Sequence, residues 1–424
     1  MTKVAEMTIQ EPHFSTFHFF SFIKSANSIH LNNTKKHLSE KTIISIFLAM
    51  LDYSQVPSPC FVLDETRLRR NMEILADIQS KTGVKIICAL KGYSFWRSFP
   101  LIREYLAGAT ASSLNEARLA REEMKKEVHV FAPVYEDDEI DEILNQADHI
   151  TFNSFSQWQR FKEKTLAHGV SAGIRVNPEF STVETDIYNP CGKYSRLGVT
   201  EVEFKPELLD GIEGLHFHAL CEQDADALES VLAAFEKHFG KYLPQMKWVN
   251  FGGGHHITRE DYHRNELVRI LKDFSARYPH LQVVMEPGEA IGWQTGELVA
   301  SVGDIVHNGM DIAILNVSVS AHMPDCLEMP YRPDIIGAAL PGEKAYTYKL
   351  TGNSCLAGDQ LGDYSFDEPL KVGDRIIFED MIHYTMVKTT FFNGVRHPSI
   401  GKFDENGKFH LLHKFTYEQF KEKL

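Results

Sequence analysis

The sequence of 424 residues has no excess of positive charge, no long apolar run and no CxxC motif. Its net charge of −14 argues against a nucleic acid or an anionic membrane as a partner, and it is compatible with a cationic substrate. Its six cysteines are scattered, which predicts reduced thiols in a cytoplasmic protein and no cysteine zinc site. The remaining composition, 43% hydrophobic and 24% charged, is typical of a soluble globular protein.

Residues 1–49 do not match the regular pattern that follows them. They lack the basic start, single apolar core and small-residue cleavage site of a signal peptide. The apolar run at 43–51 is too short to span a bilayer. We therefore expect Met50 to be the true start and residues 1–49 to be disordered or not translated.

A strict alternation of strand and helix patterns begins near residue 57. Apolar segments predict eight strands at 85–90, 109–113, 128–132, 150–153, 172–177, 214–218, 248–252 and 282–286. Helical patterns lie between most of them, at 114–124, 139–146, 155–167, 225–239 and 259–277. An open doubly wound sheet would also alternate. The count of eight and the polar or glycine residues at strand ends favour an α/β fold with a (β/α)8 TIM-like barrel over 67–290.

After Gly288 the helical periodicity almost disappears. Strands are predicted at 298–307, 310–317, 345–351, 375–378 and 384–392, linked by Gly, Pro and Asp turns. We expect a C-terminal all-β domain over 291–424. The segment 50–66 is assigned to the same domain, because its strand at 59–65 has no partner in the barrel.

Lys91 stands where the first barrel strand stops, in KIICALKGYS (85–94). An amine at the carboxyl end of a buried strand loses its proton readily and can attack a carbonyl, so Lys91 is a candidate for a Schiff base. By itself the pattern also fits a surface lysine at the start of a loop.

Barrel enzymes carry their sites at the carboxyl ends of their strands. Gly252, Gly253 and Gly254 follow the seventh strand, and Gly288 lies in a Pro-Gly turn after the eighth. Backbone without side chains lets several amides approach one anion, which predicts a phosphate site, although three glycines can also be only a turn. With Lys91, these glycines predict pyridoxal 5′-phosphate as cofactor.

Glu286, at the end of the eighth strand, gains a role from that prediction. A carboxylate at the pyridine nitrogen keeps its proton in place, so the ring can accept electrons. Pairing of Glu286 with Arg175, at the end of the fifth strand, is compatible with this role.

His216 and His218 lie two apart on the sixth strand and therefore face the same way. An HxH pair on a barrel strand can bind zinc. We favour one imidazole that stacks on a cofactor ring and no metal, because the later strand ends lack the further ligands of metal-dependent hydrolases, unless His255 or His256 serves.

GNSCLAGD (352–359) places Cys355 and Asp359 in a glycine-rich loop of the β domain. An accessible cysteine beside a cation is a usable acid or base, whereas a buried one would only fill space. Tyr384 is either a phosphate ligand or an ordinary strand aromatic.

These motifs together, from 57 to 410, resemble the alanine-racemase-like, fold-type III pyridoxal-phosphate decarboxylases of basic amino acids. Within that family the chain is most similar to the carboxynorspermidine/carboxyspermidine decarboxylases. The resemblance is carried by ALKGYS, GLHFHALCE, NFGGGHH, EPGEA, MPDCLEMPYRPD, GNSCLAGD and HYTMVKTTFFNG.

The resemblance implies an imine at Lys91, His218 on the face of the ring, the glycines and Tyr384 at the phosphate, and Glu286 at the ring nitrogen. It also implies a head-to-tail homodimer in which the second subunit supplies Cys355, as proton donor, and Asp359. Because the amines of a carboxylated triamine are cationic, we expect acidic residues along their path. Asp325, Glu328 and Asp359 are the candidates, and Arg332 is expected to orient the leaving carboxylate or to pair with one of these acids.

Two positions depart from the relatives in the family. Ornithine and diaminopimelate decarboxylases usually have Arg after EPG, where this chain has Glu289, and diaminopimelate decarboxylases usually have Glu where this chain has Leu356. The alternatives are diaminopimelate or ornithine decarboxylation, a silent regulatory homologue, and a zinc hydrolase. The preference between carboxyspermidine and carboxynorspermidine, one methylene apart, is beyond what sequence indicates.

Overall fold

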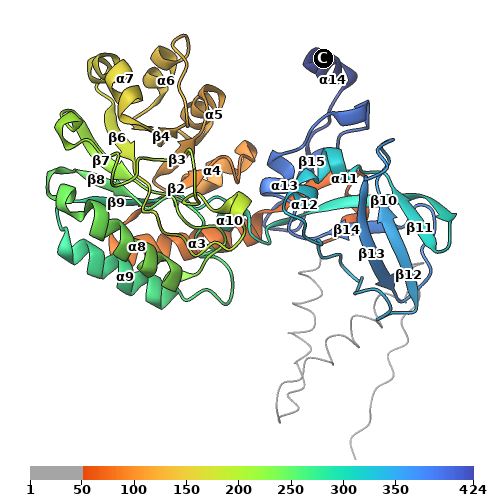
Figure 1. Cartoon of the computed structure of the whole chain (residues 1–424). Coiled ribbons are helices and arrows are strands. Elements are labelled where there is room, and N and C mark those ends of the chain that lie inside the picture. The colour runs from red at the N-terminus through yellow and green to blue at the C-terminus, as the bar shows by residue number, and fades with distance from the viewer. Residues whose placement is uncertain (1–50) are drawn as a thin grey trace, which may run out of the picture. The chain divides into compact units, whose positions relative to one another are not determined.

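Eight parallel strands, β2 to β9, close into a barrel in the computed structural model, which describes residues 51–424 (Figure 1). They are β2 (Lys85–Ala89), β3 (Gly108–Ala111), β4 (Glu127–Phe131), β5 (His149–Phe152), β6 (Ser171–Arg175), β7 (Ile212–His216), β8 (Trp248–Asn250) and β9 (Gln282–Met285). The strands pair in chain order and β9 pairs with β2, so the predicted barrel is confirmed. The expectation for residues 1–49 lies outside the described residues.

Helices cover the outside of the barrel (Figure 1). They are α3 (Glu65–Thr82), α4 (Phe99–Ile102), α5 (Leu114–Leu119), α6 (Ile140–Gln146), α7 (Phe155–His168), α8 (Ala225–Phe239) and α9 (Arg264–Arg277). In α3, the Asp64 carboxylate accepts the N–H of Thr66 at the start, and Gly83 ends the helix with a φ of 73°. Leu68 and Met72 of its apolar face are buried, which contributes roughly 1.5–3 kcal/mol per side chain.

Besides the barrel, the described residues form an eight-stranded mixed sheet. Its strands are β1 (Cys60–Asp64), β10 (Gly296–His307), β11 (Asp311–Leu315), β12 (Tyr346–Thr351), β13 (Gln360–Phe366), β14 (Arg375–Phe378), β15 (Ser399–Phe403) and β16 (Phe409–His413). The strand expected at 59–65 is β1, which pairs antiparallel with β10 and parallel with β15. From β1 in the sheet, the chain runs through the barrel and returns to the sheet.

Short helices accompany the sheet: α10 (Glu289–Gly292), α11 (Val319–His322), α12 (Pro324–Glu328), α13 (Tyr384–Val387) and α14 (Tyr417–Lys423). The predicted strand at 384–392 is wrong, because its first residues form α13. The β-branched residues of TMVKTT suggested a strand, but the Val387 N–H bonds to the His383 carbonyl, and the buried Thr385 hydroxyl lies 3.0 Å from the Tyr331 hydroxyl. Tertiary contacts override the strand propensity here.

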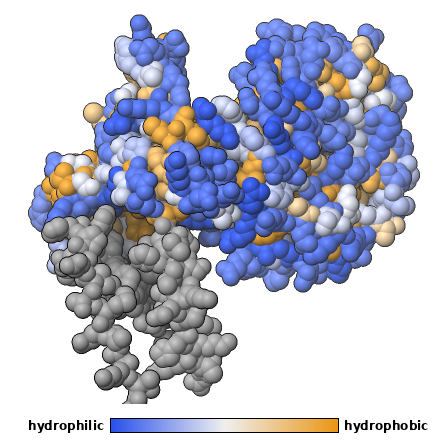
Figure 2. All heavy atoms as spheres, turned by 180° about the vertical axis from the view of Figure 1, so that it is seen from behind, coloured by the Kyte–Doolittle hydropathy of each residue, from blue (hydrophilic) through white to orange (hydrophobic). Residues whose placement is uncertain are grey.

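The prediction also missed three strands, β13, β15 and β16. Glycine and aspartate in QLGDYSF are depleted in strands, which explains why β13 has a weak strand signal. Within residues 51–424 no helix is both long and apolar enough for a bilayer crossing. The face drawn in Figure 2 is mainly hydrophilic, with a few apolar patches.

Candidate active site

A pocket of about 1270 Å³ opens at the carboxyl ends of the barrel strands. The barrel contributes Lys91, Arg175, His218 and Glu286 to its lining, and the segments around the sheet contribute residues such as Tyr384. Parallel strands bring their carboxyl ends to one edge, which explains why residues far apart in sequence meet here. Except for Gly252, which is not part of the lining, the predicted cofactor residues of the barrel thus line one pocket.

Lys91 follows β2 at the base of this pocket. Its side chain is exposed and lines the pocket. Desolvation there and the neighbouring Arg175 lower the pKa of Lys91, whereas Glu286 opposes this effect. A lowered pKa increases the fraction of neutral amine, which is the form that attacks a carbonyl.

Glu286, after β9, is held in place by the polar end of β8. Its Oε1 accepts a 2.6 Å hydrogen bond from Nδ2 of Asn250, whose Oδ1 accepts the N–H of Gly252 at 2.8 Å. His216 Nε2 lies 3.8 Å from the second oxygen of Glu286. The carboxylate therefore has one firm partner and keeps an oxygen available to a ligand.

His218 is oriented by the glycine segment after β8. Its Nδ1 accepts a 2.9 Å hydrogen bond from the N–H of Gly253, so this nitrogen carries no proton. Burial, with the charges of Lys91 and Arg175, keeps the pKa of His218 well below its usual range. The ring is therefore a neutral, fixed surface beside the pocket.

The glycines are required by the close approach of neighbouring backbone. A Cβ on Gly253 would lie 2.5 Å from the Glu286 carbonyl oxygen, and one on Gly254 would meet the Leu220 carbonyl oxygen. Within residues 51–424, the amides of Gly254, Gly288 and Glu289 donate to no protein acceptor. These three amides border the pocket and form a place where an anion such as phosphate fits.

Arg175, the last residue of β6, is a buried cation between the barrel interior and the pocket. Its guanidinium lies over the Phe131 ring, 4.6 Å from the centroid. Burial lowers its pKa to about 10, so the side chain remains charged at neutral pH. The direct pairing with Glu286 that the sequence allowed is not among the ion pairs of the described residues.

Glu289 stands where related decarboxylases usually have an arginine, and histidines surround it. His256 Nε2 lies 3.2 Å from its Oε2. Burial opposes the charge of Glu289, but His256 and His383 outweigh this effect and lower its pKa. The negative charge next to the free amides is therefore offset by imidazoles, which the sequence prediction missed.

The predicted substrate acids lie in different places. Asp325 lines the pocket and pairs with Lys388 Nζ at 2.5 Å, whereas Glu328 does not line it and pairs with the same amine at 2.7 Å. Arg332 lines the pocket, with its guanidinium 3.7 Å from the centroid of the Tyr364 ring. Of these acids, only Asp325 can meet a ligand directly.

Cys355 and Asp359 lie outside the pocket of their own chain. Cys355 is exposed, and its N–H donates to Asn393 Oδ1 at 2.7 Å. Asp359 is buried, where Ser320 N–H donates to Oδ1 and Ser354 N–H to Oδ2. Within one chain, Asp359 shapes the loop that presents Cys355.

Cys221 and Glu222 are further pocket residues that the sequence did not lead us to predict. Both residues follow β7, and Glu222 adopts a φ of 53°. Desolvation raises the pKa of Glu222, and the charge of Glu289 adds to the shift. The signal was present, because GLHFHALCE carries an acid soon after the histidine pair.

His216 and His218 are not part of any group of three possible metal ligands within residues 51–424. The donor set that borders this pocket instead suits a phosphorylated aldehyde with a basic ring nitrogen. It offers an amine with a lowered pKa, free amides, a fixed neutral ring and an anchored carboxylate.

Comparisons with known proteins agree with this donor set. A family model described as "Pyridoxal-dependent decarboxylase, C-terminal sheet domain" matches residues 50–382. A carboxyaminopropylagmatine decarboxylase from Synechocystis sp. is 52% identical over 372 residues, which cover 88% of this chain and 96% of that protein. A carboxynorspermidine/carboxyspermidine decarboxylase from Campylobacter jejuni is 48% identical over 379 residues, which cover 87% of this chain and 98% of that protein.

A solved structure has the same architecture. The crystal structure of carboxynorspermidine decarboxylase complexed with norspermidine from Campylobacter jejuni has a TM-score of 0.82 and 46% identity, covering 87% of this chain and 100% of that chain.

Proposed function

The chain belongs to the family of pyridoxal-dependent decarboxylases, and we propose that it decarboxylates carboxyspermidine or carboxynorspermidine to spermidine or norspermidine in polyamine biosynthesis. The observation that carries the proposal is the 48% identity that extends over 98% of the Campylobacter jejuni enzyme. Its cofactor is pyridoxal 5′-phosphate. Diaminopimelate or ornithine decarboxylation, the alternative from the sequence, is less well supported, because Glu289 and Leu356 depart from those enzymes.

The pocket suits a substrate with several positive charges. Burial is the main cause of the raised pKa of the Tyr384 hydroxyl. The charges of three acids, Glu289, Asp325 and Glu222, raise this pKa further. Three carboxyl groups near one point of the pocket are favourable only if cations accompany them. We assign the amines of a carboxylated triamine to this region.

A second substrate deserves the same test, because the Synechocystis relative is 52% identical. Carboxyaminopropylagmatine ends in a planar guanidinium, whereas carboxyspermidine ends in a compact ammonium. Both would place cationic groups among the same acids. The pocket volume of about 1270 Å³ admits either molecule together with the cofactor.

The cofactor has a matching partner for each of its parts. Lys91 would bind the aldehyde carbon, Glu286 the ring nitrogen and His218 the face of the ring. The phosphate would lie at the free amides of Gly254 and Gly288 and at Tyr384, with Arg175 as a further cation, while Gly252 and Gly253 donate to Asn250 and His218 and shape the segment. When bound, pyridoxal phosphate supplies an acceptor for the electron pair released as carbon dioxide leaves.

The protein's own side chains then have separate tasks. Glu286 keeps a proton on the ring nitrogen, and Asn250 keeps Glu286 in place. Arg332 orients the departing carboxylate, and Asp325 attracts the distal amines from the pocket lining. Glu328 shares Lys388 with Asp325 and acts on the amines only through its charge, and Asp359 would act from the second subunit. Cys355 donates a proton to the substrate carbon after carbon dioxide has left. Because Cys355 is exposed and is not part of the lining of its own pocket, we assign it to the pocket of a second subunit in a homodimer.

The six cysteines form no disulfide, which is consistent with a function in the cytoplasm.

The direct test of the proposed function offers the holoenzyme equal concentrations of carboxyspermidine, carboxynorspermidine, carboxyaminopropylagmatine, meso-diaminopimelate and ornithine, with carbon dioxide and the amine product measured. We expect the highest kcat/KM for one of the two carboxylated triamines. A higher value for diaminopimelate or ornithine contradicts the proposal, and a higher value for the agmatine derivative moves it to the second substrate.

Lys91 is tested by borohydride reduction of the holoenzyme followed by peptide mapping. The label should be found on the peptide that contains Lys91 and should be absent from a Lys91→Ala variant. A label on another lysine in active enzyme would overturn the assigned role.

A further inference from the structure

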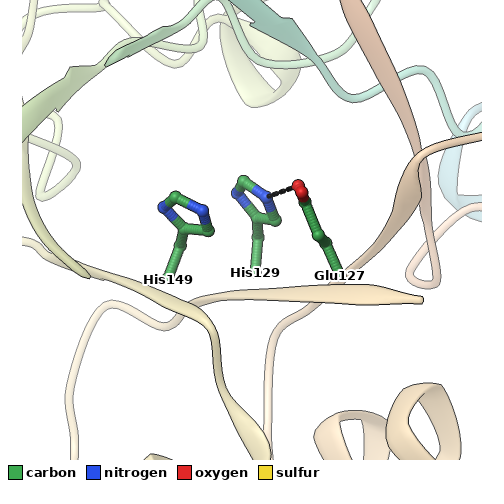
Figure 3. A group of neighbouring side chains, drawn as sticks. All are labelled: Glu127, His129 and His149. Carbon is green, nitrogen blue, oxygen red and sulfur yellow. Dashed lines mark ion pairs between the residues drawn. The ribbon is translucent and has the colours of Figure 1, made fainter. Parts of the chain in front are cut away.

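A second group of polar side chains lies inside the barrel, at the end opposite to the pocket. Glu127 and His129 belong to β4, and His149 is the first residue of β5. His129 and His149 are direct partners across these parallel strands, so their side chains share a face. Figure 3 shows that all three side chains point into the space that the strands enclose. None of them lines the pocket described above.

These side chains carry buried donor and acceptor atoms without hydrogen-bond partners. They are Oε2 of Glu127, Nε2 of His129 and Nδ1 of His149. The distance from His129 Nε2 to Glu127 Oε2 is 3.6 Å, which is too long for a hydrogen bond. Leaving a buried polar atom without a partner costs about 1–3 kcal/mol, so three such atoms in one group require an explanation.

One imidazole in particular is directed into the group. The His129 side chain is only 5% exposed, and its free nitrogen faces the Glu127 carboxylate. The rings of His129 and His149 stack with centroids 4.2 Å apart. One ligand atom from each of the three residues falls within 4.8 Å of the others.

We propose that Glu127, His129 and His149 bind a divalent first-row transition metal ion, with Zn²⁺ as the preferred ion. Two imidazoles and one carboxylate are a frequent ligand set for zinc, and bonds of about 2.0–2.1 Å place tetrahedral ligand atoms about 3.3 Å apart. His129 Nε2 and Glu127 Oε2, 3.6 Å apart, are close to this spacing, and rotation of the His149 ring would bring the third ligand atom within reach of the ion. The Glu127 side chain is 35% exposed, which leaves a route for the ion and a place for a water as fourth ligand.

Neighbouring residues contact two of these ligands, Glu127 and His149. Lys85 Nζ bonds to Oε1 of Glu127 at 2.5 Å and leaves Oε2 for the ion. The Trp248 ring packs edge-on against His149 at 5.4 Å, and its Nε1 donates to Ser171 Oγ at 2.9 Å. Such outer contacts fix ligand orientation.

The ion would stabilise the barrel and take no part in decarboxylation, because its ligands stand at the starts of the strands. It would connect β4 to β5 at their amino ends. A ligand that binds the folded state alone stabilises it by RT ln(1 + L/Kd), where L is the free ligand concentration, so the unfolding temperature rises as this concentration is increased. This inference does not depend on the proposed function.

The test uses the pyridoxal-phosphate holoenzyme after treatment with a chelator. Equilibrium dialysis against ZnCl2 gives stoichiometry and affinity, and the electronic spectrum with Co²⁺ reports the ligand types. Both are measured for the wild type, His149→Gln, Lys85→Met and His307→Gln. His307 is an exposed histidine paired with Asp311 on the surface and serves as the matched control. Cofactor absorbance and thermal unfolding verify that each variant is folded.

We expect one ion per chain, a raised unfolding temperature with Zn²⁺, and a Co²⁺ spectrum without a thiolate charge-transfer band. His149→Gln should weaken binding by at least about tenfold, Lys85→Met by about tenfold, and His307→Gln not at all. His149→Gln is preferred to a His129 variant because His149 is the less buried of the two. Absence of binding, equal binding by the wild type and His149→Gln, or a thiolate band from an exposed cysteine such as Cys355 would each overturn the proposal.

Discussion

His383 Nε2 lies 3.2 Å from Asp380 Oδ2, next to the pocket where Tyr384 contributes to the lining. Burial by itself disfavours the charged form of His383. The charge of Asp380, followed by those of Glu289 and Asp325, outweighs burial and raises the pKa to about 9. His383 is therefore a cation at neutral pH, beside free amides and in place of the arginine that related decarboxylases usually have.

This relationship predicts a loss of stability in alkali. The folded-state pKa of about 9 is higher than the ordinary value of 6.5, so the stabilisation is fully present below pH 6.5 and is lost as the pH rises through 9. The free energy of unfolding, measured by urea titration between pH 6 and 10, should decline over this range. In His383→Gln the decline should be clearly smaller. Equal declines in the two proteins would mean that another group is responsible.

The contact between Asn250 and Glu286 predicts graded effects on catalysis. Glu286→Gln removes the carboxylate that keeps the ring nitrogen protonated, and we expect kcat to fall by about 100-fold or more with little change in KM. Asn250→Ala removes one hydrogen bond to a charged group, worth about 1.5–3 kcal/mol, so kcat should fall by about 10- to 100-fold.

A purely structural role of Asn250 would lower stability without this kinetic pattern. Cofactor absorbance as a function of pH separates the two, because a displaced Glu286 shifts the titration of the bound cofactor. An Asn250→Asp variant that restores neither kcat nor the titration would still be consistent, whereas an Asn250→Ala variant with wild-type kcat would refute the positioning role.

The barrel was predictable because its signals are local and repeat. Each strand is a short apolar run that ends in a polar residue or glycine, and parallel topology brings those ends to one edge. Lys91, Arg175, His218 and Glu286 could therefore be grouped from their places in the pattern alone. The predicted bounds of the barrel strands agree with the structure within a few residues, because each apolar run is short and its end is marked by a polar residue or glycine.

The parts that sequence did not reveal depend on contacts between residues that are far apart in the sequence. The Tyr384 segment is helical because it packs on residues around Tyr331, which no local pattern encodes. His383 and His256 gain their roles only by meeting Glu289 in space. The group at Glu127, His129 and His149 combines residues of two strands that register brings together. Lone histidines in strands carry no signal of such a group.

Glu222 is expected to select for cationic substrates. Glu222 is exposed in the pocket that it lines, desolvation there raises its pKa, and a nearby substrate ammonium would stabilise its charged form. Glu222→Gln should therefore raise KM for the carboxylated triamine by about tenfold, equivalent to about 1.4 kcal/mol, with a smaller effect on kcat.

Glu229→Gln is the matched control for Glu222, because Glu229 lies on the outer helix α8 and pairs with Arg269 at the surface. Its KM should remain that of the wild type. If Glu222→Gln leaves KM unchanged as well, the amines bind elsewhere in the pocket.

The positions of Lys91 and Cys355 predict complementation between subunits. Lys91 lines the pocket, whereas Cys355 is exposed and lies outside the pocket of its own chain. If each pocket takes Cys355 from its partner, Lys91→Ala and Cys355→Ala homodimers are both inactive, but a mixed dimer contains one pocket with both native residues. Random pairing of equal amounts should restore about a quarter of the wild-type activity.

To form mixed dimers, the two variants are unfolded and refolded together or coexpressed with two different tags, and sedimentation gives the oligomeric state of the mixture. Tag-selected mixed dimers should have about half of the wild-type activity per dimer. If subunit exchange is verified and the mixture of the two variants still has no activity, each pocket uses residues of one chain only, because then no mixed dimer contains an intact pocket.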